Sequence, residues 1–114
     1  MTFDEAIAFA LKLPDTEQST SYGQPAVKVR SNGRAFLFPS HEADTSFGLA
    51  MDRDTIELLK DTDPDIFWQT KHYEGWEGVL VRYAAGDEDR VREIIGRARD
   101  WVATKPKVRP RKRK

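Results

Sequence analysis

Two short runs of alternating side chains, residues 26–30 and 34–38, limit most strongly what this chain can fold into. In the first run two valines share one face and two basic side chains share the other, and in the second run two phenylalanines share a face. An alternation of period two is typical of β-strands with one buried face. The Ser-Asn-Gly between the runs contains residues that tolerate a positive φ. The sequence therefore predicts an antiparallel hairpin.

Helical patterns lie at both ends of the chain. Thr2 and Glu5 have the spacing of a capping box, which predicts a helix over residues 3–12. Asp87 is placed to cap a second helix over residues 87–103, whose first turn is acidic. Apolar residues recur at helical spacing along the second helix: Val91, Ile94, Ile95, Ala98, Trp101 and Val102. This stripe predicts that the helix packs on the sheet, with Trp101 as a core anchor.

The middle of the chain adds further strands. Residues 47–51 and 77–83 alternate like strands, a short helix follows Asp52 or Asp54, and a short strand is expected near residues 66–69. Residues 15–24 are polar and contain breakers, and we expect a loop there. Strands grouped between terminal helices predict an α+β fold, with one antiparallel sheet packed on its helices and its other face more open.

The net charge of zero conceals a strong asymmetry. Residues 105–114 contain seven basic residues and no acidic ones, which leaves 12 basic and 19 acidic residues in residues 1–104. The first 104 residues therefore carry a net charge of about −7. We expect one domain over residues 1–104 and a disordered basic tail over residues 105–114, because the tail has two prolines and no apolar periodicity. The tail is either an arm for a polyanion such as nucleic acid or a solubilising end.

Catalytic and cofactor signatures are missing from the sequence. The chain has no cysteine, no glycine-rich phosphate loop and no apolar run of membrane-spanning length. His41 and His72 lack the paired spacing of metal ligands, so we interpret both as surface or turn residues. The N-terminus is acidic where a signal peptide is basic. We therefore expect a cytoplasmic, non-enzymatic protein without a cofactor.

Basic and aromatic side chains provide the candidate binding residues. Lys71 lies among aromatic residues in the run Phe-Trp-Gln-Thr-Lys-His-Tyr-Glu-Gly-Trp, an arrangement that on a single-strand-binding surface stacks bases. The alternative is that these aromatics belong to the core or its rim. The candidate nucleic-acid-binding residues are Lys28, Arg30, Arg34, Lys71, Arg82, Lys105, Lys107, Arg109, Arg111, Lys112, Arg113 and Lys114. The first five form a stripe if their strands are neighbours, and otherwise they are solvated faces paired with acidic residues.

The ordered series of motifs resembles the YjbR/MmcQ family of small bacterial proteins. The resemblance rests on Tyr22-Gly23, Pro25, the alternation that follows, and the later runs GLAMDRDTIELLKDTDPDIF and KHYEGWEGVLVRY, and it covers residues 1–104. It implies an α+β fold likened to secretion-chaperone-like and frataxin-like sheets. It also implies DNA binding through a double-wing arrangement of hairpins.

These observations give two functional hypotheses. In the first, the protein associates with nucleic acid through the hairpin at residues 27–38 and the basic tail, and its DNA binding is tolerant of sequence and sensitive to salt. In the second, the protein is a protein-interaction or chaperone-like adaptor that uses the open face of the sheet. Under either hypothesis it acts without a membrane, as a monomer or a homodimer.

Overall fold

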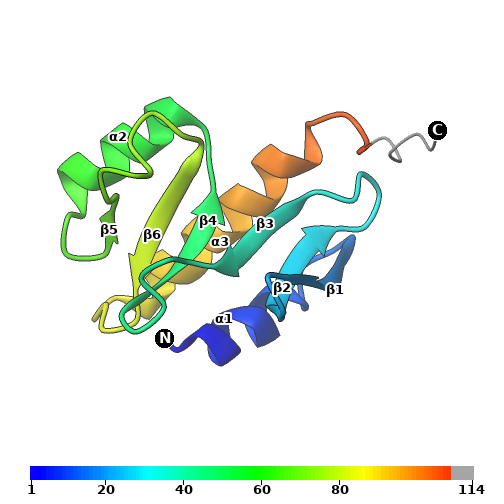
Figure 1. The fold of residues 1–114 in the computed structure, drawn as a ribbon, viewed down its shortest axis with the longest axis horizontal. Helices are drawn as coiled ribbons and strands as arrows, with labels where there is room; N and C mark the ends of the chain where they lie inside the picture. Colours follow the sequence, from blue (N-terminus) through cyan, green and yellow to red (C-terminus); the bar gives the residue numbers. More distant parts are fainter. Residues whose placement is uncertain (109–114) are drawn as a thin grey trace.

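The computed structural model describes residues 1–108 (Figure 1). The elements in chain order are α1 (Phe3–Ala10), β1 (Thr16–Ser21), β2 (Gln24–Val29), β3 (Ala35–Pro39), β4 (Ser46–Ala50), α2 (Arg53–Thr62), β5 (Phe67–Trp68), β6 (Gly78–Arg82) and α3 (Glu88–Ala103). The strands form one sheet in the order β1-β2-β3-β4-β6-β5. Every neighbouring pair of strands is antiparallel. The predicted α+β fold with an antiparallel sheet is confirmed.

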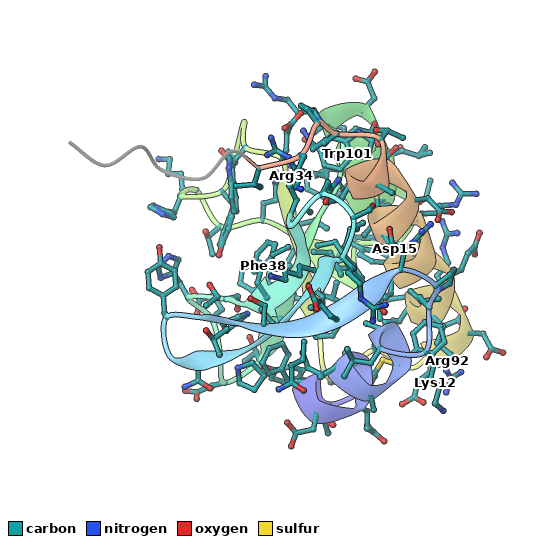
Figure 2. The ribbon with its side chains drawn as sticks, turned by 90° about the vertical axis from the view of Figure 1, so that its right-hand side faces the viewer. Lys12, Asp15, Arg34, Phe38, Arg92 and Trp101 are labelled. Carbon is teal, nitrogen blue, oxygen red and sulfur yellow. The ribbon has the colours of Figure 1, made fainter. Side chains whose placement is uncertain are left out.

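The helices leave one face of the sheet uncovered. In Figure 1, α3 runs behind the sheet across β3 and β4, and it also contacts β2 and α1. Meanwhile α2 packs on β5 and β6 at the far end of the sheet. Phe38 points to the side of the sheet away from α3 (Figure 2). The open face is therefore the face on which Phe38 lies, and the hydrophobic core lies between the sheet and the helices.

A register shift brings two consecutive β3 residues into this core. Val27 pairs with Leu37 and Lys28 pairs with Ala35, so the ladder skips Phe36. An extra residue in one strand breaks the strict alternation of faces. Phe36 and Leu37 are consequently both fully buried in the main core cluster.

The helix caps predicted from the sequence are present. Glu5 donates its backbone N–H to the Thr2 hydroxyl at 3.1 Å, and the Glu5 carboxylate accepts the Thr2 N–H at 2.8 Å. The side chains of Asp52 and Asp87 cap α2 and α3. The structure ends α1 at Ala10, two residues before the predicted end.

The core anchor predicted at Trp101 is only partly correct. Val91, Ile94, Ile95, Ala98 and Val102 of the α3 stripe are fully buried. Trp101 packs against the core from its rim and stays partly exposed. The Nζ atom of Lys105 lies 4.3 Å from the centroid of the Trp101 ring, on the outer side of the core.

The loop predicted at residues 15–24 is wrong, because β1 occupies most of it. β1 pairs with β2 from Thr16 opposite Val29 to Ser21 opposite Gln24. Tyr22 and Gly23 both have positive φ, at 52° and 77°, as a two-residue hairpin turn of type I′ requires. β1 lies at an edge of the sheet and is polar throughout, so it lacks the apolar alternation that marks buried strands.

Among residues 1–108, none of the helices is both long enough and apolar enough to cross a membrane.

Candidate functional site

Two aromatic rings lie flat on the open face of the sheet because glycines lie beneath them. Phe38 of β3 lies over Gly48 of β4, and a Cβ at Gly48 would overlap the Phe38 ring. Trp76, in the loop between β5 and β6, lies over Gly78 in the same way, with a Cβ there only 2.5 Å from the indole. A glycine inside a strand often marks a site where another group approaches closely. These two glycines position the aromatic surface.

Further rings extend this surface into a cluster. The ring centroids of Phe38 and Trp76 are 6.0 Å apart, and those of Tyr73 and Trp76 are 5.1 Å apart in a nearly stacked arrangement. The His41 and His72 rings meet edge to face at 5.2 Å and both lie near Tyr73. Burial raises the pKa of the Tyr73 hydroxyl, a shift partly opposed by a hydrogen bond from the His41 backbone. Tyr73 therefore remains neutral at physiological pH.

A groove of about 970 Å³ runs along these rings, and we call it the aromatic groove. Its walls include Tyr22 at the β1–β2 turn, Phe38 on the sheet, and His72, Tyr73 and Trp76 from the loop before β6. Tyr22 is 96% exposed and Trp76 is 51% exposed, so both rings are available to a partner. Among the described residues that line the groove there is no Asp, Glu, Lys or Arg. The groove therefore suits a flat or apolar group without charge.

The contact between the His41 and His72 rings is not predicted by the sequence. His41 follows β3 and His72 precedes β6, 31 positions apart in the chain, so no local motif connects them. Both are exposed turn residues, as predicted. Within the described part of the chain, no group of three His, Cys, Asp or Glu side chains is placed to hold a metal ion.

The basic residues of the β2–β3 hairpin are largely occupied by contacts within the protein. Lys28 lies 3.6 Å from the Glu17 carboxylate of β1, and Arg30 lies 3.9 Å from the same carboxylate. Arg30 also donates a hydrogen bond of 3.1 Å to the carbonyl oxygen of Thr16. Glu17 neutralises part of the charge that the hairpin would present to a polyanion.

The remaining sheet residues do not complete a basic stripe. Arg82 lies on β6, which β3 and β4 separate from the β2 strand of Lys28. Three strand spacings amount to roughly 14 Å. The Arg82 guanidinium lies 4.5 Å from the centroid of the Trp68 ring, and Lys71 is exposed in the loop after β5. The structure therefore keeps Lys28 apart from Arg82, and the binding role of Lys28, Arg82 and Lys71 stays a prediction.

The basic segment begins as a stretch of chain that contacts the β2–β3 turn. Arg34 donates a hydrogen bond of 2.6 Å from Nε to the carbonyl oxygen of Pro106. The backbone N–H of Val108 donates to the carbonyl oxygen of Asn32 at 2.8 Å. Lys105 lies 3.5 Å from the Glu77 carboxylate, whereas Lys107 is exposed. Residues 105–108 thus follow the surface of the domain, and the predicted positions Arg109, Arg111, Lys112, Arg113 and Lys114 lie outside the described residues.

The buried side chain of Asn32 stabilises the contact between the β2–β3 turn and the residues that follow α3. Its side-chain amide donates to the carbonyl oxygens of Val102 at 2.7 Å and Lys105 at 3.2 Å, and its side-chain oxygen accepts the Arg34 N–H at 3.0 Å. Asn32 is only 5% exposed. This buried polar side chain connects the β2–β3 turn to the end of α3.

The end of the described chain lies beside the aromatic groove. Arg34, Lys105 and Val108 line a second, shallower depression of about 360 Å³. Trp76, Ala35 and Ala50 line both the depression and the aromatic groove. Figure 2 shows Arg34 and Trp101 at the end of the molecule where the described chain stops. The chain therefore leaves the domain at the rim of the groove, close to Trp76.

Comparison with known proteins identifies the family. The YjbR family model matches residues 11–101, which is well over half of the chain. No curated protein and no solved structure matches the chain significantly. The family match spans the sheet, the loop that carries Trp76 and nearly all of α3. The chain therefore belongs to the YjbR family.

Proposed function

We propose that this protein is a non-enzymatic nucleic-acid-binding protein of the cytoplasm. The observation that carries the proposal is the contact of residues 105–108 with the β2–β3 turn, through Arg34 and Asn32. This contact fixes where a strongly basic segment begins, at the rim of the uncharged aromatic groove. Five of the six residues that follow Val108 are basic. Phosphates would contact this segment, and the domain would provide a fixed point of attachment.

The charge distribution separates an acidic domain, residues 1–104, from a basic C-terminal segment, residues 105–114. Residues 1–104 carry 12 basic and 19 acidic residues, so the domain as a whole repels a polyanion. The hairpin side chains Lys28 and Arg30 share Glu17 as their partner, and Arg34 is engaged with Pro106. We therefore assign most of the phosphate affinity to the segment after Val108 and a smaller part to the hairpin.

Fluorescence anisotropy with a labelled DNA duplex at low salt tests this proposal. The full chain is compared with a variant that ends at Val108, which keeps the contacts to Asn32 and Arg34. We expect the shortened protein to lose most of its affinity. A triple change of Lys28, Arg30 and Arg34 to Ala in the full chain should lower the affinity only modestly. Equal binding by the full and the shortened chains would contradict the proposal, and so would the absence of binding by either.

A second candidate function is that of a protein-interaction adaptor. It is favoured by the aromatic groove itself, which is rich in aromatic rings, has no Asp, Glu, Lys or Arg among its described lining residues, and has a freely exposed ring, Tyr22, at one end. An extended apolar segment of a partner protein would bury these rings favourably. Loss of nucleic-acid binding in all forms of the chain would leave this candidate as the better account.

A further inference from the structure

The aromatic groove has the chemistry of a binding site for nucleobases. Bases are flat, uncharged at neutral pH and aromatic, and they stack on Trp, Tyr, Phe and His rings with little preference among sequences. The groove offers rings of these four types: Trp76, Tyr73, Tyr22, Phe38, His41 and His72. Because no Asp, Glu, Lys or Arg among the described residues lines it, no carboxylate, ammonium or guanidinium group would have to be desolvated when a base enters.

We propose that the aromatic groove receives unpaired bases, so that the ligand of this protein is single-stranded nucleic acid. The inference rests on the proposed nucleic-acid-binding function and specifies its substrate class. In a duplex the faces of the bases are already stacked on one another, so turning a base face toward a protein ring costs unstacking and unpairing energy, which a single strand largely avoids. A ligand that used the groove would therefore have to be unpaired at the bound positions.

The position of the basic segment favours a nucleic acid over other occupants of the groove. Val108 is fixed to Asn32 beside Trp76, and the six residues that follow can extend at most about 20 Å. A strand with its bases on Trp76 would therefore have its phosphates within reach of the five cations that follow Val108.

The main ring of the groove, Trp76, already packs against neighbouring residues, so the stacking of a base on it would not require the domain to rearrange. Trp76 rests on Gly78 and packs beside Phe38 and Tyr73, which hold its inner face while half of its surface stays exposed. The backbone that carries Tyr22 is fixed by the β1–β2 turn, in which Tyr22 and Gly23 both have positive φ. A platform that is already formed loses little conformational entropy on binding.

The experiment compares a single-stranded dT 12-mer with a duplex of equal length, using the full chain. We expect tighter binding of the single strand and quenching of tryptophan fluorescence as it binds. Changing Trp76 to Ala should weaken single-strand binding about 5- to 150-fold, the range expected for the loss of one stacked base. Its affinity for the duplex should change by less than about twofold, since duplex binding would depend on phosphate contacts.

Two further variants make the result specific. Leu58 on α2 is also a large exposed apolar residue but lies outside the groove, so Leu58→Ala should bind like the wild type. Trp76→Phe retains a ring and should restore most of the single-strand affinity if Trp76→Ala lowers it through stacking. Circular dichroism and thermal melting establish that each variant is folded.

The possible outcomes separate this inference from the function on which it rests. If the full chain binds the duplex as well as the single strand, and Trp76→Ala affects neither, the groove does not take bases but the nucleic-acid function stands. If the chain binds neither ligand at low salt, the function itself is wrong. Tight binding of a labelled Leu- and Phe-rich peptide, abolished by Trp76→Ala while single-strand binding is retained, would assign the groove to a protein partner and overturn the inference.

Discussion

The side-chain amide of Asn32 donates a hydrogen bond of 2.7 Å to the carbonyl oxygen of Val102, 70 positions further along the chain. This contact joins the tip of the β2–β3 hairpin to the last turn of α3 in the interior of the protein. It determines where the chain runs after the helix, and hence where the basic segment begins. The β2–β3 turn, which the sequence marks only as a reversal, is therefore also an attachment point.

Replacement of Asn32 tests the strength of this attachment. Asn32→Ala removes the hydrogen bonds of a buried amide to the carbonyl oxygens of Val102 and Lys105 and the acceptor of the Arg34 N–H, so we expect the free energy of unfolding to fall by about 1–3 kcal/mol. Ser31 is its exposed neighbour in the same turn, and Ser31→Ala is the matched control with little expected effect. Urea denaturation provides the measurement. Equal midpoints for the two variants would show that the amide contributes no stability.

Because the Trp76 ring lies over Gly78, we expect substitutions at Gly78 and at Gly86 to affect the protein differently. A methyl group at Gly78 would overlap the indole ring, whereas one at Gly86 would meet nothing within 4 Å. Gly78→Ala should therefore displace Trp76, shift its indole N–H resonance in an ¹⁵N–¹H spectrum and lower the affinity for single strands. Gly86→Ala should leave both unchanged. An unchanged indole N–H resonance of Trp76 in Gly78→Ala would show that the ring does not lie over Gly78.

The partial exposure of Trp101 predicts a smaller stability loss than a fully buried ring would give. Truncation of a buried aromatic residue to Ala usually costs about 3–5 kcal/mol, and we expect this loss for Phe36→Ala. Trp101 lies at the rim of the core, so Trp101→Ala should cost less than about 3 kcal/mol. Chemical denaturation of both variants provides the comparison. A larger loss for Trp101 would show that its ring anchors α3 after all.

Gly96 offers a stabilising substitution. It lies in the interior of α3, and a Cβ there meets nothing within 4 Å. Alanine is favoured over glycine within a helix by about 0.5–1 kcal/mol. Gly96→Ala should raise the melting temperature without changing the affinity for nucleic acid. A lower melting temperature would contradict the helical geometry assigned at this position.

The α1 cap predicts a dependence of stability on acid. The hydrogen bond that the Glu5 carboxylate accepts from the Thr2 backbone N–H lowers the pKa of Glu5 below its usual value. A lowered pKa in the folded state contributes stability that is present above the ordinary carboxyl pKa and is lost as the pH falls through the lowered value. Melting temperatures between about pH 6 and pH 3 should therefore fall less steeply for Glu5→Gln than for the wild type. Identical pH profiles would show that this cap does not contribute.

The sequence was informative wherever a local pattern reflects burial on one face. The alternation at residues 26–30, the capping residues Asp52 and Asp87, and the α3 stripe all lie in elements that the structure confirms. The prediction that Phe36 and Phe38 share a face is wrong, because the register shift in β3 places Phe36 in the core and leaves Phe38 on the open face. β1 was missed because an edge strand in a polar environment needs no apolar residues, and its formation depends on pairing with β2. Only Tyr22-Gly23 at the turn indicated a hairpin there.

The candidate site was harder to predict because the fold assembles it from distant segments. Nothing local connects His41 with His72, or Asn32 with Val108. The usable signal was Gly48, since a glycine within an apolar strand suggests a ring or ligand close by. The basic stripe on the sheet depended on strand order, and the structure separates its members across β3 and β4.

The dependence of affinity on salt shows whether the basic segment after Val108 provides the phosphate contacts. Log affinity falls with log salt at a slope of about −0.9 for each phosphate neutralised on duplex DNA, so a basic segment that engages about five phosphates gives a slope near −4 to −5. We predict this slope for the full chain on a duplex, and a much shallower slope with weak binding for the chain that ends at Val108. The same slope and affinity in both forms would contradict the account, because the binding would then reside in the folded domain.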